Sequence, residues 1–214
     1  MIWDNNDDIR LIECANDKRT IQRHLNDCRE ERRPYVFITN TMNIKPLHRL
    51  LVPVSMLEEE TYKAEICTYI ARKTGAHIIL LQANDYGSHA KQNVNRIVTH
   101  INKINERLAA EQPAKENDPS SGSSNGPITY EIVLARKDSF KLVQEAAERQ
   151  RDFRHDLLIL TASRDYGLDD ILFGPPERKA IQHALVPVML VNRVKICSLC
   201  ATKSVILQTK ICIF

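Results

Sequence analysis

The chain has 214 residues, of which 43% are hydrophobic and 27% are charged. This composition is typical of a globular protein, and the length allows one full domain with additional residues. The net charge of +3 is too small to indicate nucleic-acid binding, and no apolar run reaches the roughly 18 residues of a transmembrane helix. No signal-peptide pattern precedes the six cysteines, so we expect reduced thiols in a cytoplasmic protein.

The N-terminal segment, residues 1–45, contains one predicted helix and one predicted strand. Asp17 is suited to cap the helix, and the apolar residues PYVFIT at 34–39 predict the strand. The inward positions of the helix have helical spacing: Ile21, Leu25 and Cys28. Because one helix and one strand cannot bury a core, we expect this segment to pack on the rest of the protein.

From residue 48 onward, apolar strand-like segments alternate with helical segments. The predicted strands are 48–54, 77–81, 128–134, 157–160 and 186–191. Continuous apolar strands separated by helices are typical of a parallel sheet that is covered on both faces. We therefore predict an α/β fold with a five-stranded, doubly wound parallel sheet. Ligands of such sheets bind at the carboxyl ends of the strands, at the topological switch point.

The predicted helices are marked by their ends and by their apolar spacing. The helix that follows the first of these strands ends at Gly75, and the helix over 90–108 has the strongest apolar period in the chain. Pro175 and Pro176 open the last helix. Residues 113–127 are rich in proline, glycine and serine and predict a flexible loop inside a domain that spans 46–192. Residues 193–214 form an atypical C-terminal tail.

A short internal repeat links the two ends of the chain. The segment RPYVFITN at 33–40 resembles LVPVMLVN at 185–192, and both combine a proline, an apolar strand and an asparagine. Residues 1–45 are therefore interpreted as the end of a second copy of the domain. Chance similarity between two short apolar strands is the alternative. We expect the strand at 35–39 to pair with the strand at 187–191, in the same chain or in a partner chain.

Two segments resemble the universal stress protein family. HRLLVPVS at 48–55 resembles the first strand of the family, and residues 157–192 resemble its C-terminal third, so the resemblance covers roughly 46–192. The chain is most similar to the second half of tandem two-domain members of the Bacteroidetes type, with a truncated first half. The resemblance implies a Rossmann-like fold, a stress-response role, a dimer formed through the last strands and, in some members, ATP binding.

The resemblance also implies where a nucleotide would bind. ATP-binding members carry glycines and a Ser/Thr after the fourth strand, and usually an Asp after the first strand. In this chain the matching site positions are Pro53, Ser55, Thr161, Arg164, Gly167, Gly174 and Pro175.

Three parts of this site depart from the family pattern. Thr161 and Arg164 replace glycines that allow the backbone to approach a phosphate. Pro175 replaces the Ser/Thr and has no N–H to donate, and Ser55 replaces the Asp. Arg164 could compensate by binding phosphate with its guanidinium, or it could pair with Asp165 or Asp169. We therefore predict a degenerate pocket, with ATP binding weak or absent.

One weak motif for metal or redox chemistry is present, the C-x-x-C at Cys197 and Cys200, and we interpret it as two thiols without a role because a zinc site needs four ligands and only Cys212 is near in the sequence. The chain lacks the G-x-S-x-G, H-E-x-x-H and P-loop patterns, and its histidines lack metal-ligand spacing. His89 and His100 are expected on the polar side of the long helix, together with Asn93. The leading hypothesis is a non-enzymatic regulatory module that acts by association. The alternatives are an ATP-binding switch that uses Arg164 and Gly174 and, ranked last, an adenylate-transferring relative.

Overall fold

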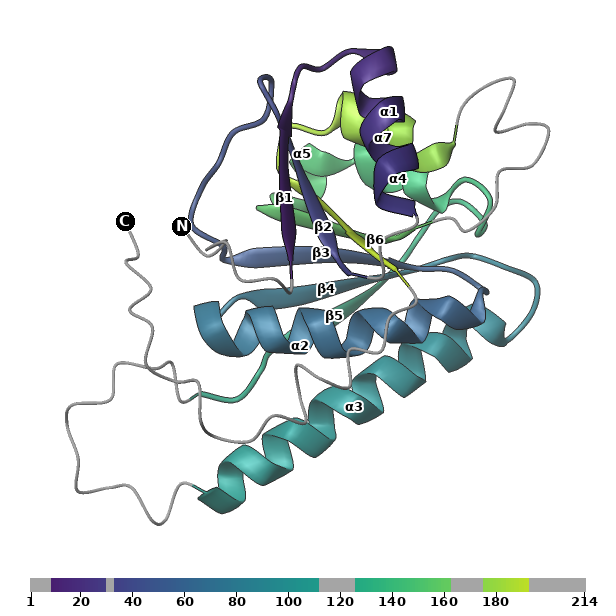
Figure 1. The fold of residues 1–214 in the computed structure, drawn as a ribbon. Helices are drawn as coiled ribbons and strands as arrows, with labels where there is room; N and C mark the ends of the chain where they lie inside the picture. The colour runs from purple at the N-terminus through teal and green to yellow at the C-terminus, as the bar shows by residue number, and fades with distance from the viewer. Residues whose placement is uncertain (1–8, 30–32, 112–125, 163–174, 193–214) are drawn as a thin grey trace, which may run out of the picture.

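The computed structural model describes residues 9–29, 33–111, 126–162 and 175–192 (Figure 1). These residues form a seven-stranded sheet in the order β1-β2-β7-β6-β3-β4-β5. The strands are β1 (Arg10–Cys14), β2 (Tyr35–Thr39), β3 (Arg49–Val54), β4 (His77–Gln82), β5 (Tyr130–Leu134), β6 (Leu157–Thr161) and β7 (Val188–Val191). All neighbouring pairs are parallel except β2 and β7, which run antiparallel.

The predicted α/β class and the five parallel strands β3 to β7 are confirmed, and the full sheet has seven strands rather than five. β2 is the strand predicted at 34–39, whereas β1 was not predicted. The N-terminal segment adds β1 and β2 to the sheet. β1 escaped prediction because its sequence, RLIEC, mixes charged and apolar residues, and only Ile12 in it is buried. A strand at the edge of a sheet needs less apolar sequence than a central strand, and this weakens its signal.

Helices cover both faces of the sheet. They are α1 (Lys18–Arg29), the 3₁₀ helix η1 (Glu58–Tyr62), α2 (Lys63–Thr74), α3 (His89–Glu111), α4 (Leu142–Glu148), α5 (Gln150–Phe153) and α7 (Pro176–His183). The sheet residues of one apolar cluster pack on α2 and α3, and those of the other pack on α1, α4 and α7. Figure 1 shows these two groups on opposite sides of the sheet. Within the described ranges, no helix is long and apolar enough to cross a membrane.

The helix ends follow the predicted signals. The Asp17 carboxylate accepts the backbone N–H groups of Arg19 and Thr20 at 3.0 and 2.9 Å, which satisfies amides at the start of α1. Gly75 adopts the left-handed conformation, with φ of 72°, at the end of α2. A residue with a side chain would be strained there, which explains the glycine.

The antiparallel pair of β2 and β7 joins two units of the same construction. Each unit is a strand, a helix and a parallel strand: β1-α1-β2 on one side and β6-α7-β7 on the other. Tyr35 lies opposite Leu190, and Phe37 lies opposite Val188. Since α1 and α7 cover the same face, an approximate two-fold rotation relates the units. This arrangement agrees with the short sequence repeat at 33–40 and 185–192.

The amino end of β6 holds a buried histidine. His155 is 4% exposed, and neither of its ring nitrogens has a hydrogen-bond partner among the described residues. Burial lowers the pKa of His155 to about 4, and the neighbouring Arg49 acts in the same direction, while Asp156 opposes both. Asp156 accepts the backbone N–H groups of His48 and Arg49 at 2.9 and 3.0 Å, so it ties β6 to β3.

We expect His155 to make the protein less stable in acid. Between pH 6.5 and about 4 the unfolded chain binds a proton at this residue and the folded chain does not. The free energy of unfolding should therefore fall as the pH falls, by up to about 1.4 kcal/mol per pH unit. Urea denaturation across this range should show a shallower pH dependence for His155→Met. The exposed His89→Gln serves as the control, and equal pH slopes for both variants would contradict the assignment.

Candidate functional site

The topological switch point lies between β3 and β6. These two strands are neighbours, and the chain leaves β3 toward α2 on one face and leaves β6 toward α7 on the other face. Ser55 follows the last residue of β3, and Thr161 is the last residue of β6. Both side chains therefore lie at the carboxyl ends of adjacent strands, which is where open α/β sheets bind their ligands.

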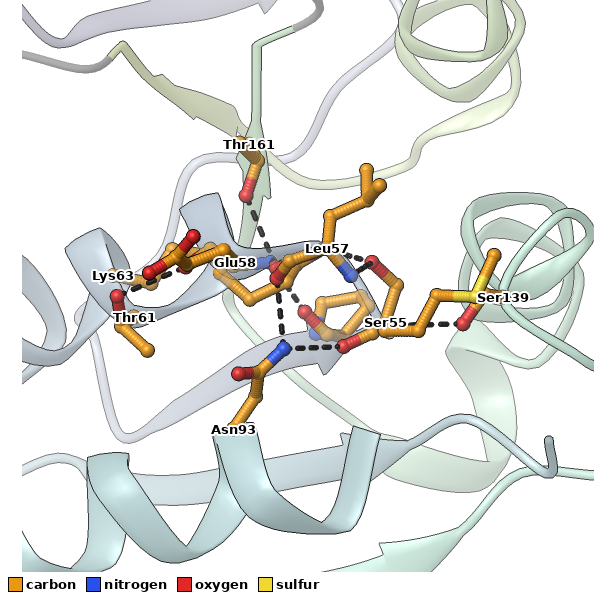
Figure 2. A network of polar contacts seen from close by, with 11 residues as sticks. Ser55, Leu57, Glu58, Thr61, Lys63, Asn93, Ser139 and Thr161 are labelled. Carbon is orange, nitrogen blue, oxygen red and sulfur yellow. Dashed lines mark hydrogen bonds and ion pairs between the residues drawn. The ribbon is translucent and has the colours of Figure 1, made fainter. Parts of the chain in front are cut away.

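The carboxylate of Glu60 connects the two strands across this switch point. The Ser55 hydroxyl donates to Oε1 of Glu60 at 2.5 Å, and the Thr161 hydroxyl donates to Oε2 at 3.0 Å. Glu60 belongs to the short helix η1, and its side chain is only 7% exposed. Figure 2 shows Ser55 and Thr161 reaching into this network from different strands. The polar groups that close the switch point therefore come from the chain itself.

Lys63 completes the network with a positive charge. Its ammonium group forms an ion pair with Oε2 of Glu60 and donates a hydrogen bond to the carbonyl of Pro53 in β3. The side chain of Lys63 is 2% exposed. Moving two charges out of water is costly unless they pair and their remaining hydrogen-bonding groups are satisfied. Here Ser55, Thr161 and the Pro53 carbonyl supply those partners, so the charges balance without a ligand.

The loop after β3 is fixed by hydrogen bonds from two sides. Asn93 of α3 donates to the carbonyls of Ser55 and Leu57 at 3.0 and 2.7 Å (Figure 2). The hydroxyl of Ser139, in the loop after β5, accepts the N–H of Met56 at 2.8 Å.

That same hydroxyl donates to the carboxylate of Asp85, in the loop after β4, at 2.5 Å. The loops after β3, β4 and β5 are thus held together by hydrogen bonds.

The start of α7 is a poor binding site for anions. Pro175 is the N-cap residue and Pro176 the first helical residue, so neither position offers an N–H. Glu177 is buried in the first turn and places a negative charge where the helix dipole favours one. Anion binding at a helix start depends on free amides and on an unopposed dipole. Both are reduced in α7.

The structure places some of the predicted site residues and not others. Pro53, Ser55 and Thr161 contact the Glu60–Lys63 pair, and Pro175 stands at the start of α7 as predicted. Arg164, Gly167 and Gly174 lie outside the described residues. The role of all seven residues in binding a nucleotide stays a prediction.

Sequence reasoning missed the residues that dominate the network. Glu60 and Lys63 stand three residues apart beside a buried strand, and opposite charges at this spacing are the signal that could have found them. Asn93 was expected on the polar side of α3, but it is 3% exposed. The side-chain amide of Asn93 donates to two carbonyls of the loop instead of to water. A polar residue at this position therefore serves a buried contact and does not mark a solvated face.

Other chemistry has little support in the described part of the chain. No group of three His, Cys, Asp or Glu residues there is placed to hold a metal ion. Burial raises the pKa of the Cys67 thiol to about 12, so this cysteine remains protonated and weakly nucleophilic.

Comparison with known families agrees with the geometry of the sheet. The model of the universal stress protein family matches residues 46–192. The chain belongs to the universal stress protein family. The match covers β3 to β7, and β1, α1 and β2 precede it. A comparison with curated proteins gives no significant match.

Solved universal stress proteins share the fold at low sequence identity. The structure of a universal stress protein from Archaeoglobus fulgidus DSM 4304 is 13% identical, with a TM-score of 0.56 and 87% of this chain covered. This chain spans 61% of that protein.

A universal stress protein in complex with cAMP is 12% identical and has a TM-score of 0.45, with 69% of this chain and 98% of that chain covered. At 13% identity, the similarity to the Archaeoglobus fulgidus structure supports the fold alone.

Breaking the ion pair should destabilise the protein strongly. Lys63→Met leaves the Glu60 carboxylate buried without its counter-charge, which should lower the free energy of unfolding by about 3–5 kcal/mol. The double variant Glu60→Gln/Lys63→Met removes both charges and keeps partners for Ser55 and Thr161, so it should recover most of this loss. Urea denaturation measures both.

The control is Glu131→Gln, which breaks the exposed pair with Arg49 and should cost less than about 1 kcal/mol. If Lys63→Met had an equally small effect, the buried pair would not stabilise the switch point.

Proposed function

We propose that this chain is a non-enzymatic regulatory module of the stress response whose nucleotide crevice is closed by its own side chains. The observation that carries the proposal is the buried Glu60–Lys63 pair between Ser55 and Thr161. This network stands at the carboxyl ends of β3 and β6, where a nucleotide would enter an open α/β sheet. The module therefore acts through its surface and its associations rather than through bound triphosphate.

Charge at the crevice supports this proposal. A triphosphate at the switch point would meet the Glu60–Lys63 pair, in which the two charges already balance. The pair therefore offers an anion no net positive charge. Lys63 does not offer its ammonium to a ligand, because Glu60 and the Pro53 carbonyl already hold it.

The missing donors support the proposal in a second way. Phosphate-binding loops hold their anion through backbone N–H groups at a helix start. Pro175 and Pro176 remove two such donors. Ser55 donates its hydroxyl proton to Glu60 and accepts the N–H of Leu57, so its hydroxyl is already committed to contacts within the chain.

A titration with ATP and magnesium tests the proposed closure. We expect ATP to bind no more tightly than inorganic tripolyphosphate, which carries similar charge without a base or ribose. Arg164→Ala and Ser55→Ala should leave ATP binding unchanged. Isothermal titration calorimetry measures each affinity.

The opposite result would favour the ATP-binding switch. In that case ATP would bind with micromolar affinity, tripolyphosphate would not reproduce the binding, and Arg164→Ala would abolish it.

We further propose that residues 1–45 are the remnant of a first domain of the tandem type, and that they occupy the edge through which the last strand would otherwise associate. Support comes from β2, which lies against β7 in the antiparallel register Tyr35–Leu190 and Phe37–Val188. While β2 stays there, a second chain has no access to that edge of β7. Self-association through the last strand would require β2 to leave.

Deleting residues 1–45 tests this role. The deletion uncovers the β7 edge and the apolar residues beneath α1, so we expect lower thermal stability and a shift from monomer to dimer or larger species. Size-exclusion chromatography with light scattering gives the mass. A chain that lacks only residues 1–8 keeps β1, α1 and β2 and is the matched control. Unchanged mass and stability after removal of residues 1–45 would contradict the pairing role.

A further inference from the structure

A basic groove lies between α1 and α7. It is separate from the switch point between β3 and β6. Its volume is about 460 Å³, which is within the range of small-molecule sites. Gln22 of α1 and Arg178 of α7 meet in it, and the Arg178 guanidinium donates to the Gln22 side-chain oxygen at 3.2 Å. Figure 1 shows the two helices on the same face of the sheet. The groove exists because β2 pairs with β7 and so brings α1 beside α7.

The groove is lined almost entirely by cationic and amide side chains. The cations are Lys18, Arg19, Arg23 and Arg178, and Asp27 is the one carboxylate in the lining. Lys18, Arg19 and Arg23 form no ion pair with another described residue. Their three positive charges therefore gather around an open concave surface that has Asp27 as its one carboxylate.

The arrangement of these cations is unfavourable for α1 by itself. Arg19 and Arg23 are four residues apart, and like charges at this spacing destabilise a helix. Lys18 and Arg19 also stand in the first turn, where the helix dipole disfavours positive charge and where no acidic residue is present. Asp17 offsets part of this, but its carboxylate is engaged by the amides of Arg19 and Thr20. An anion in the groove would relieve the remaining repulsion.

We propose that this groove binds a small polyanion with several phosphate groups, held by Lys18, Arg19, Arg23 and Arg178. One guanidinium group can donate two parallel hydrogen bonds to two oxygens of a phosphate, and it keeps its positive charge at every physiological pH. The lining has no aromatic side chain on which a base could stack, so the groove recognises phosphate charge and not a nucleoside. The start of α1 is capped by Asp17, and the contacts to the ligand therefore come from side chains rather than from free amides.

A calorimetric titration tests this site. Inorganic tripolyphosphate is added to the full-length chain at low ionic strength. We expect one equivalent to bind, with an affinity that falls as salt is added because exposed charges are screened. The variant Arg19→Gln/Arg23→Gln should weaken binding at least tenfold. It should also raise the thermal stability of the free protein, or leave it unchanged, because it removes a like-charge pair.

The matched control is Lys91→Gln/Arg96→Gln, which removes the same charge from exposed positions on α3. Equal weakening in both variants would mean that net charge alone attracts the anion, and this would overturn the proposal. Absence of binding to the unmodified chain would overturn it as well. A duplex DNA bound more tightly than tripolyphosphate, with the same loss in the α1 variant, would replace the small ligand with a nucleic acid.

The outcome is separable from that of the closed crevice. ATP that binds through the groove should match tripolyphosphate in affinity and should be lost in Arg19→Gln/Arg23→Gln. ATP that binds in the crevice should survive that variant and should exceed tripolyphosphate in affinity. The first result supports the proposed groove and is consistent with the proposed closure of the switch point. The second result contradicts that closure, whether or not the groove also binds an anion.

Discussion

The antiparallel contact between β2 and β7 determines the shape of this molecule. Without it β7 would be an exposed edge strand, although its four residues are buried and apolar. β2 is also fully buried, so each strand supplies the neighbour that the other requires. The pairing fixes where α1 lies, because a strand-helix-strand unit crosses over with one hand and so places its helix on one face of the sheet. The groove between α1 and α7 is a consequence of this strand register.

The buried pair at the switch point ties two neighbouring strands of the sheet together. The carboxylate of Glu60 links β3 to β6 through Ser55 and Thr161, and Lys63 balances its charge. The polar groups at the ends of these strands are thus committed to contacts within the fold. Family membership and nucleotide binding are therefore separate properties, because the same sheet supports either arrangement.

The sequence predicts the helix ends and strands that depend on local pattern. It does not predict polar contacts between residues that are far apart along the chain. Asp17 and Gly75 mark helix ends through their own backbone chemistry, and HIILL at 77–81 marks a buried strand, so these elements could be read directly. Glu60 and Asn93 look like surface residues, because acidic and amide side chains usually are. Their burial depends on β6 and on the loop after β3, which only the folded chain brings near. The assignment of Ser55 to a nucleotide site stays a prediction, and its partner Glu60 was not predicted.

The distribution of charge gives the two surfaces different chemistry. At the crevice, carboxylates and prolines stand where a phosphate would need donors. On α1, three cations surround the groove with Asp27 as the one carboxylate among them. Arg19 and Arg23 repel each other at their spacing of four residues, so these charges do not serve the stability of α1 alone. Binding of an anion outside the crevice accounts for both features, and it gives the N-terminal segment a purpose beyond completing the sheet.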